Sequence, residues 1–150
     1  MPALLDGVAQ VPIGYLPWFL YTVPLVASPA AFTIFDVLFS DGSGNFDRLV
    51  TDDYVMTTGY CFAAADYSVG DTEVQVLAPG SLVAMIAYTT TLLPFCLVKF
   101  HYASSVQTAV IATATDLAAG KVMGRYIANL SNYVQVSAAN DPIIVHSGVL

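Results

Sequence analysis

The chain of 150 residues has few of the charged side chains from which helices are usually built. Its acidic residues are ten Asp and a single Glu, Glu73, and it has only two Lys. Glu, Lys and Arg favour helices, whereas Asp favours caps and turns. Val, Thr, Tyr, Phe and Ile, which suit a pleated surface, are abundant. The sequence therefore predicts a fold made of β-strands, with little helix.

Charge is scarce along the whole chain. Four Lys and Arg stand against eleven Asp and Glu, so that 10% of the residues are charged and the formal net charge is -7. Soluble domains usually have about 25% charged residues. So few cations exclude nucleic acid binding through a basic surface, and the high apolar content excludes intrinsic disorder. A folded domain of this composition has an apolar surface, which predicts that it works inside an assembly.

Two long stretches, residues 7–35 and 74–98, contain no Asp, Glu, Lys, Arg or His. Each is longer than the roughly 20 residues of a membrane-spanning helix. Prolines interrupt both stretches, and in lipid the freed backbone groups have no water to bind. The first cation of the chain is Arg48, so the positive flank of a spanning helix or a signal peptide is missing. We expect no transmembrane helix, no targeting segment and no membrane partner.

Residues 1–36 have the features of an extended apolar arm. Proline recurs at positions 2, 12, 17, 24 and 29 among apolar neighbours, which favours extended conformations. Such a segment cannot bury its own side chains, so we expect it to lie on its own domain, on a neighbouring subunit or on another protein. The alternative is a proline-rich edge strand with loops in one compact domain. The arm residues expected at an interface are Pro12, Tyr15, Leu16, Pro17, Trp18, Phe19, Leu20, Tyr21, Pro24 and Leu25.

Short β patterns alternate with turn signals from the end of the arm onward, which predicts a β-barrel-like domain over residues 37–150. Strict alternation places Val74 and Val76 on one face of a strand, and Val98 and Phe100 on one face of another. Such spacing is typical of an all-β fold, a small barrel or sandwich of about eight or nine short strands, and no internal repeat stands out. The expected strands cover residues 31–40, 54–63, 72–76, 81–88, 97–102, 105–113, 121–128, 133–136 and 143–146.

One loop partly matches a calcium-binding pattern. Asp41 to Asp47 places oxygen-bearing side chains at alternate positions, as a helix-flanked calcium loop does. Phe46 stands where such a loop needs glycine, and neither flank has a helical pattern. We therefore expect a solvated hairpin loop and no metal.

Residues for catalysis are few. The cysteines, Cys61 and Cys96, are compatible with a disulfide but favour two buried thiols, because a free Cys behaves as a small core residue. Neither His101 nor His146 belongs to a recognisable catalytic or zinc motif. The sequence predicts no enzyme and no cofactor. An enzyme would need one of the histidines beside a Cys or an Asp in a pocket.

Three runs of the chain carry a family resemblance: Pro79 to Ala84, Pro94 to Lys99 and Ala112 to Tyr126. They combine an apolar strand, an Ala/Thr-rich segment and the phrase Gly-Lys-Val-Met-Gly-Arg-Tyr at 120–126. With these runs the chain resembles the small β-domain decoration proteins, or cement proteins, of tailed-bacteriophage heads. The resemblance covers roughly residues 50–150 and rests on short phrases without a catalytic signature.

The resemblance implies a structural role on the exterior of a virion capsid. Decoration proteins of this kind are typically homotrimers that sit where capsomers meet and clamp the major capsid protein. We therefore expect the major capsid protein and further copies of the chain as partners. The residues of the β-domain expected at interfaces come from the uncharged stretch 74–98 and are Leu82, Met85, Leu92, Leu93 and Phe95. The alternatives are a tail or fibre component, and a β-barrel that binds an apolar ligand.

Overall fold

The computed structural model describes residues 20–52, 54–88, 91–131 and 137–150. These residues form an all-β fold, which confirms the expected fold class. Ten strands make up two antiparallel sheets, and the helical segments between them are short. The elements are β1 Leu20–Pro24, β2 Val37–Ser40, β3 Phe46–Arg48, η2 Met56–Thr58, β4 Tyr60–Ala63, β5 Glu73–Leu77, β6 Leu82–Ile86, β7 Leu97–Ala103, β8 Val106–Ile111, α1 Ala114–Ala118, β9 Val122–Asn129 and β10 Pro142–Ser147.

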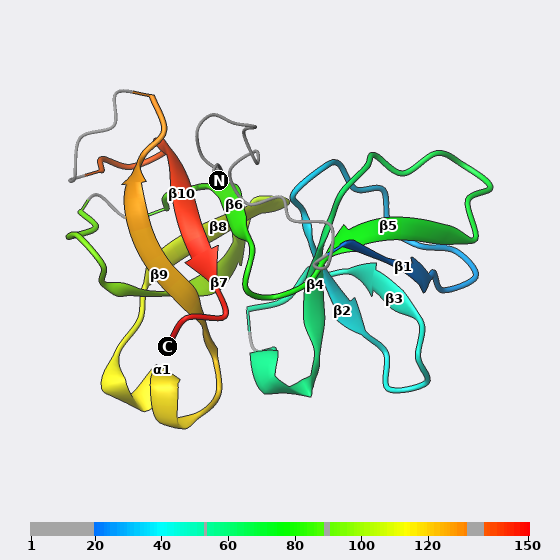
Figure 1. The fold of residues 1–150 in the computed structure, drawn as a ribbon, viewed down its shortest axis with the longest axis horizontal. Coiled ribbons are helices and arrows are strands. Elements are labelled where there is room, and N and C mark those ends of the chain that lie inside the picture. The colour runs from blue at the N-terminus through cyan, green and yellow to red at the C-terminus, as the bar shows by residue number, and fades with distance from the viewer. Residues whose placement is uncertain (1–19, 53, 89–90, 132–136) are drawn as a thin grey trace, which may run out of the picture.

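Each sheet closes on itself. The strand order is β1-β5-β4-β2-β3 in one sheet and β6-β10-β9-β7-β8 in the other. A parallel bridge between Leu25 and Phe46 joins the two edges of the first sheet, and one between Ala87 and Ala109 joins those of the second. Figure 1 shows the two sheets as separate lobes, with β6 and β8 on the side that faces the other lobe. The structure therefore has two five-stranded barrels, a first barrel (β1–β5) and a second barrel (β6–β10), where the sequence predicts one domain of about eight or nine strands.

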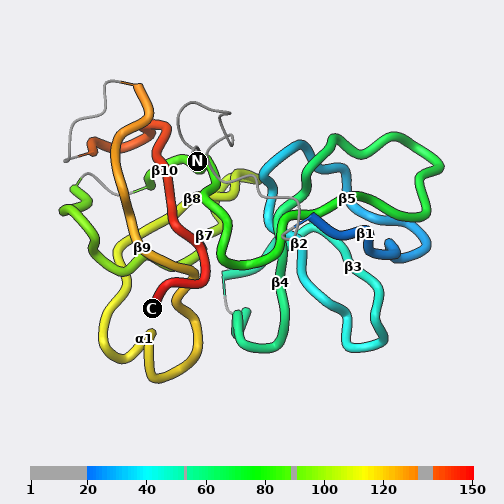
Figure 2. Tube along the Cα trace, viewed as in Figure 1, coloured from blue at the N-terminus to red at the C-terminus, as the bar shows by residue number. Residues whose placement is uncertain are grey.

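The two barrels have the same topology. Adding five to each strand number in the first order gives the second order. In both barrels a short helical segment, η2 or α1, follows the third strand and precedes the fourth. The coloured part of the trace in Figure 2 runs through the first lobe and then through the second, so the described chain completes the first barrel before it begins the second. The fold is thus an internal duplication.

The turn before the second strand repeats in detail. In the turn 33–36 the amide of the last residue donates to the carbonyl of the first at 3.0 Å, and in the turn 93–96 the same bond measures 3.1 Å. The third residue of each turn is a phenylalanine with positive φ, 70° at Phe35 and 61° at Phe95. Positive φ is uncommon outside glycine, so a shared Phe in this conformation supports the equivalence of the two turns.

The loop before the fifth strand repeats as well. The Asp71 carboxylate accepts a hydrogen bond from Ser68 N at 2.9 Å, and the Asp141 carboxylate accepts one from Ala138 N at 2.8 Å. In both loops the Asp amide donates back to the carbonyl of the residue three positions earlier. Such side-chain bonds stabilise a turn by satisfying its backbone donors.

The hydrophobic core has two parts. A smaller cluster fills the first barrel and contains Leu25, Phe32, Leu38, Cys61, Ala63, Val74 and Val76. A larger cluster fills the second barrel and also includes side chains of the first barrel, namely Val37, Leu49, Met56, Phe62 and Leu77. Neighbouring residues on a strand point to opposite faces. The first barrel therefore buries one face of its strands inside itself and the other against the second barrel.

The start of the described chain belongs to the first barrel. β1 pairs with β5 from Leu20, opposite Leu77, to Pro24, opposite Glu73. Phe32 is buried beyond it. Residues 20–36 are thus built into the barrel as a strand and loop, which is the alternative to a separate arm, and no boundary falls between residues 36 and 37. The arm residues 1–19 and the expected strand 133–136 lie outside the described residues.

Candidate functional site

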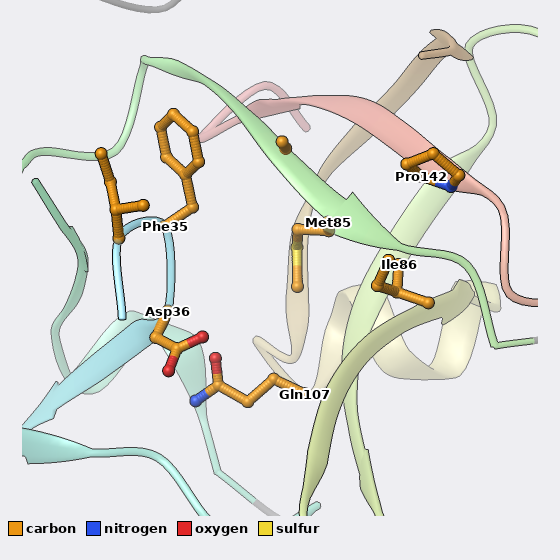
Figure 3. A pocket seen from close by; sticks show the side chains of 8 residues that line it. Phe35, Asp36, Met85, Ile86, Gln107 and Pro142 are labelled. Carbon is orange, nitrogen blue, oxygen red and sulfur yellow. The ribbon is translucent and has the colours of Figure 1, made fainter. Parts of the chain in front are cut away.

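A groove lies where the turn 33–36 of the first barrel meets β6 and β8 of the second. It holds a cavity of about 250 Å³ (Figure 3), whose lining includes Phe35, Asp36, Met85, Ile86, Gln107 and Pro142. A neighbouring hollow of about 490 Å³ shares Asp36, Ile86 and Gln107 with it. Both hollows therefore belong to the junction between the barrels.

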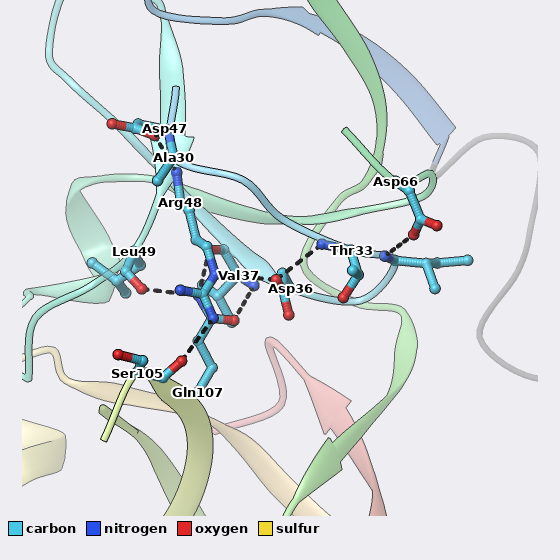
Figure 4. A network of polar contacts seen from close by, with 11 residues as sticks. Ala30, Thr33, Asp36, Val37, Asp47, Arg48, Leu49, Asp66, Ser105 and Gln107 are labelled. Carbon is cyan, nitrogen blue, oxygen red and sulfur yellow. Dashed lines mark hydrogen bonds and ion pairs between the residues drawn. The ribbon is translucent and has the colours of Figure 1, made fainter. Parts of the chain in front are cut away.

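Gln107 is the central polar side chain of this junction. Its Oε1 accepts a hydrogen bond from Val37 N at 2.7 Å, and its Nε2 donates to the carbonyls of Val37 and Leu49, each at 2.9 Å. Leu49 N also donates to Val37 O at 3.0 Å. The side-chain amide of β8 thus inserts into the β2–β3 pairing of the first barrel, where it satisfies backbone groups (Figure 4).

An ion pair closes the same junction. Arg48 Nε lies 3.1 Å from Asp36 Oδ2, and both side chains are mostly buried. The Asp36 carboxylate also accepts from Thr33 N at 3.0 Å, and Arg48 Nη2 donates to Ser105 O of the second barrel at 3.4 Å (Figure 4). The Arg48 guanidinium lies over the Tyr102 ring, 5.7 Å from its centroid. These bonds join the two barrels and balance one positive charge with one negative charge.

The structure brings one histidine beside a carboxylate. His101 Nδ1 lies 3.3 Å from Asp52 Oδ2, and the Tyr88 ring stacks on the imidazole with a centroid distance of 4.2 Å. Asp52 also accepts a hydrogen bond from the backbone amide of Tyr102. Neither His101 nor Asp52 lines the groove. Their contacts attach a loop of the first barrel to β7 of the second.

The loop with the partial calcium pattern uses its carboxylates to bind backbone amides. Asp41 Oδ1 accepts from Ser43 N at 2.7 Å and from Asn45 N at 3.1 Å. The bond from Ser43 N is the main reason that the Asp41 pKa lies below its usual value. Asp47 Oδ1 accepts from Ala30 N at 2.9 Å. Across the described ranges, no three His, Cys, Asp or Glu side chains are grouped as a metal site requires.

Both cysteines are free thiols. Cys61 is buried in the first barrel, and burial raises its pKa to about 12. Cys96 is half-buried, and burial is again the main reason that its pKa is raised. A raised pKa disfavours the reactive thiolate. The expectation of a buried thiol is confirmed for Cys61 and holds in part for Cys96.

The residues expected at interfaces divide into four groups. Leu25, Met85 and Leu92 are at most 7% exposed and belong to the core of the chain, so they have no surface to offer a partner. Leu20 and Leu82 are half-buried. Pro12, Tyr15, Leu16, Pro17, Trp18 and Phe19 lie outside the described residues.

Four of the expected interface residues are exposed: Tyr21 and Pro24 on β1, and Leu93 and Phe95 in the turn 93–96. Phe95 is 60% exposed although its backbone is held on both sides of the turn: its amide donates to Tyr126 O at 3.0 Å, and its carbonyl accepts from Arg125 Nη1 at 2.8 Å. An exposed aromatic ring on a backbone held in this way suits a contact with another molecule.

No helix among residues 20–52, 54–88, 91–131 and 137–150 combines the length and the apolar character needed to cross a membrane. Comparison of the chain with models of protein families, with curated proteins and with solved structures gave no match.

Proposed function

We propose that the protein is a structural subunit of a virion, a decoration protein that binds the outside of a capsid shell as a homotrimer and stabilises it. Its partners in this role are the major capsid protein and further copies of the chain. The observation that carries the proposal is the exposed turn 93–96, with Leu93 54% and Phe95 60% exposed in a chain that has only 10% charged residues. The resemblance in the sequence supports the same role.

Attachment of this kind needs no chemistry. Burying apolar surface contributes about 25 cal/mol per Å², so a small contact is weak by itself. A trimer repeats that contact three times on one shell, and effective concentration then multiplies the affinity. Two barrels joined by Gln107, by the Arg48–Asp36 pair and by a shared core suit such a clamp, because they present the exposed turn from a well-packed body.

The test is sedimentation of the purified chain with capsid shells of its source phage that lack it. We expect saturable binding and a higher temperature of shell disruption. Phe95→Asn should weaken binding, because asparagine accepts the positive φ of this position but lacks the ring. Val69→Asn is the control, since Val69 is 97% exposed in the loop between β4 and β5. Absence of the chain from shells, or its recovery with tails or fibres, would contradict a decoration role.

A second candidate function is binding of an apolar ligand in the groove between the barrels. The apolar lining by Phe35, Met85 and Ile86 favours it, but the cavity of about 250 Å³ is smaller than the roughly 300–1,000 Å³ of most ligand sites. Native mass spectrometry of the purified chain decides this: a bound lipid or sugar supports the ligand, and the bare chain mass contradicts it.

A further inference from the structure

One face of the first barrel is buried against the second barrel. We call it the docking face, and it consists of Phe35, Val37, Leu49, Met56 and Phe62. Phe35 lines the groove beside β6, and the other four side chains belong to the core cluster that the barrels share. Because the barrels have the same topology, the second barrel has a corresponding face.

Equivalent hydrogen bonds identify the residues of that corresponding face. The amide of Phe35 donates to Ala63 O at 2.8 Å, and the amide of Phe95 donates to Tyr126 O at 3.0 Å. Phe95 therefore takes the place of Phe35. Arg125, which precedes Tyr126, takes the place of the residue before Ala63.

A second repeated bond extends the correspondence to the third strand. Leu49 N donates to Val37 O at 3.0 Å in the first barrel, and Ala112 N donates to Leu97 O at 2.8 Å in the second. Leu97 therefore takes the place of Val37, and Ala112 takes the place of Leu49. α1, which takes the place of η2, adds Leu117.

The corresponding face is exposed where the docking face is buried. Leu117 is 40% exposed, and Leu93 and Phe95 are more exposed still. Leu97 and Ala112 are half-buried. We call Leu93, Phe95 and Leu117 the open face. In the first barrel Val37, Leu49 and Phe62 are 0% exposed and Met56 is 3% exposed. The second barrel thus presents exposed apolar side chains at the position where the first barrel is covered by another barrel.

We propose that the open face binds the first barrel of a second copy of this chain, along β1, as the docking face binds β6 within the chain. β1 corresponds to β6 in the strand order, and its residues Thr22 and Pro24 are exposed. Glu73, exposed opposite Pro24, supplies a negative charge there. Arg125 supplies a positive charge beside Phe95. The two surfaces are therefore complementary in charge, and the contact continues the packing that already joins the barrels.

The two sides of this contact differ, so it is heterologous. A heterologous contact generates a closed ring or an open chain of subunits. Closure after three copies would give the homotrimer of the proposed function. Only that number rests on the proposed function; the open face and its partner strand follow from the duplication.

The experiment measures sedimentation velocity of the full chain and of its variants at protein concentrations up to about 100 µM. At these concentrations a complex with a micromolar Kd is populated. Phe95→Asn alters the open face, Glu73→Arg alters the β1 side, and Val69→Asn is the control. We expect Phe95→Asn to weaken self-association at least about 30-fold, as truncation of a central aromatic anchor does. Glu73→Arg should weaken it as well, and Val69→Asn should leave it unchanged.

Mixing the two defective variants tests the geometry. One copy then supplies an intact β1 side and the other an intact open face, so heterodimers should form although neither variant associates alone. A mixture that stays monomeric would overturn the head-to-tail contact. A wild-type chain that is monomeric throughout, yet needs Phe95 to bind shells, would overturn the inference and leave the proposed function standing. Self-association through Phe95 without any binding to shells would support the inference and contradict the proposed function.

Discussion

The first barrel buries apolar side chains on both sides of β2 and β4, whereas the second barrel buries them mainly inside. Leu38 lies in the interior of the first barrel, while its neighbour Val37 joins the core shared with the second. In the second barrel Val98 is buried and its neighbour Leu97 is only half-buried. The outer face of these strands is thus covered by the other barrel in the first barrel and is partly exposed in the second. Among the residues that the structure describes, the second barrel therefore lacks the cover that the first one has.

The largest expected effect is at Phe62, in β4 of the first barrel. Phe62→Ala removes a ring that is 0% exposed in the shared core and should destabilise the chain by about 3 to 5 kcal/mol. Arg125→Ala alters the corresponding position of the second barrel and removes one bond to Phe95 O, so it should cost about 1 kcal/mol. Urea unfolding of both variants measures the two free energies. Equal losses would show that the two faces do not differ in the way described.

The next effect concerns the junction itself. Gln107→Leu keeps the size of the side chain but leaves Val37 N and Leu49 O without the amide that they bind. Burying such groups without a partner should destabilise the chain by about 2 to 3 kcal/mol. Gln75→Leu, on the exposed face of β5, is the matched control and should change stability little. The thermal midpoints of the two variants measure the difference in stability. An unchanged midpoint for Gln107→Leu would mean that the hydrogen bonds of Gln107 do not stabilise the junction between the barrels.

Phe35 and Phe95, which both have positive φ, allow the two barrels to be compared at equivalent turns with the same residue type. Phe35→Asn removes a ring that packs against the shared core and should destabilise by about 2 kcal/mol. Phe95→Asn removes an exposed ring from the same kind of turn and should change stability by no more than about 0.5 kcal/mol. Both variants keep a residue that tolerates positive φ. Chemical unfolding measures both, and a large loss for Phe95→Asn would show that its ring is already covered within the chain.

The sequence predicted the local β pattern well, because alternation reports directly on burial. Val74 and Val76 are buried in β5, between the exposed Glu73 and Gln75. The buried Val98 of β7 confirms the second alternation. The recurring prolines place β1 in the predicted arm, although the strand pairs fully with β5.

The duplication was not visible in the sequence, because equivalent positions have different surroundings and hence different residues. Cys61 and Gly124 lie two residues before the equivalent positions in β4 and β9. A Cβ at Gly124 would lie 2.2 Å from His146 O, so only glycine fits there. The insertion of Gln107 into the other barrel was equally hidden, because a single polar residue in a strand does not reveal its partner. The Phe35/Phe95 and Asp71/Asp141 pairs keep both residue type and role.

The two helical segments differ in their caps, and this difference should have the smallest effect on stability. α1 has a capping box in which Thr113 and Asp116 satisfy each other's backbone amides, and Asp116 also binds Lys99 Nζ at 2.8 Å, whereas η2 has no side-chain cap. The bond to Lys99 is the main reason that the Asp116 pKa is lowered from 3.8 to about 2. Because the folded-state pKa is the lower one, this stabilisation is complete above pH 3.8 and is lost as the pH falls toward 2.

Asp116→Asn should therefore destabilise the chain by about 0.5 to 1 kcal/mol at neutral pH, the range of a surface pair with a cap. The gap between wild type and variant should close between pH 4 and pH 2, where the wild-type carboxylate takes up its proton. Urea unfolding at a series of pH values measures that gap. A constant gap would mean that Asp116 acts through its shape alone, and that α1 is held, like η2, by packing instead of by charge.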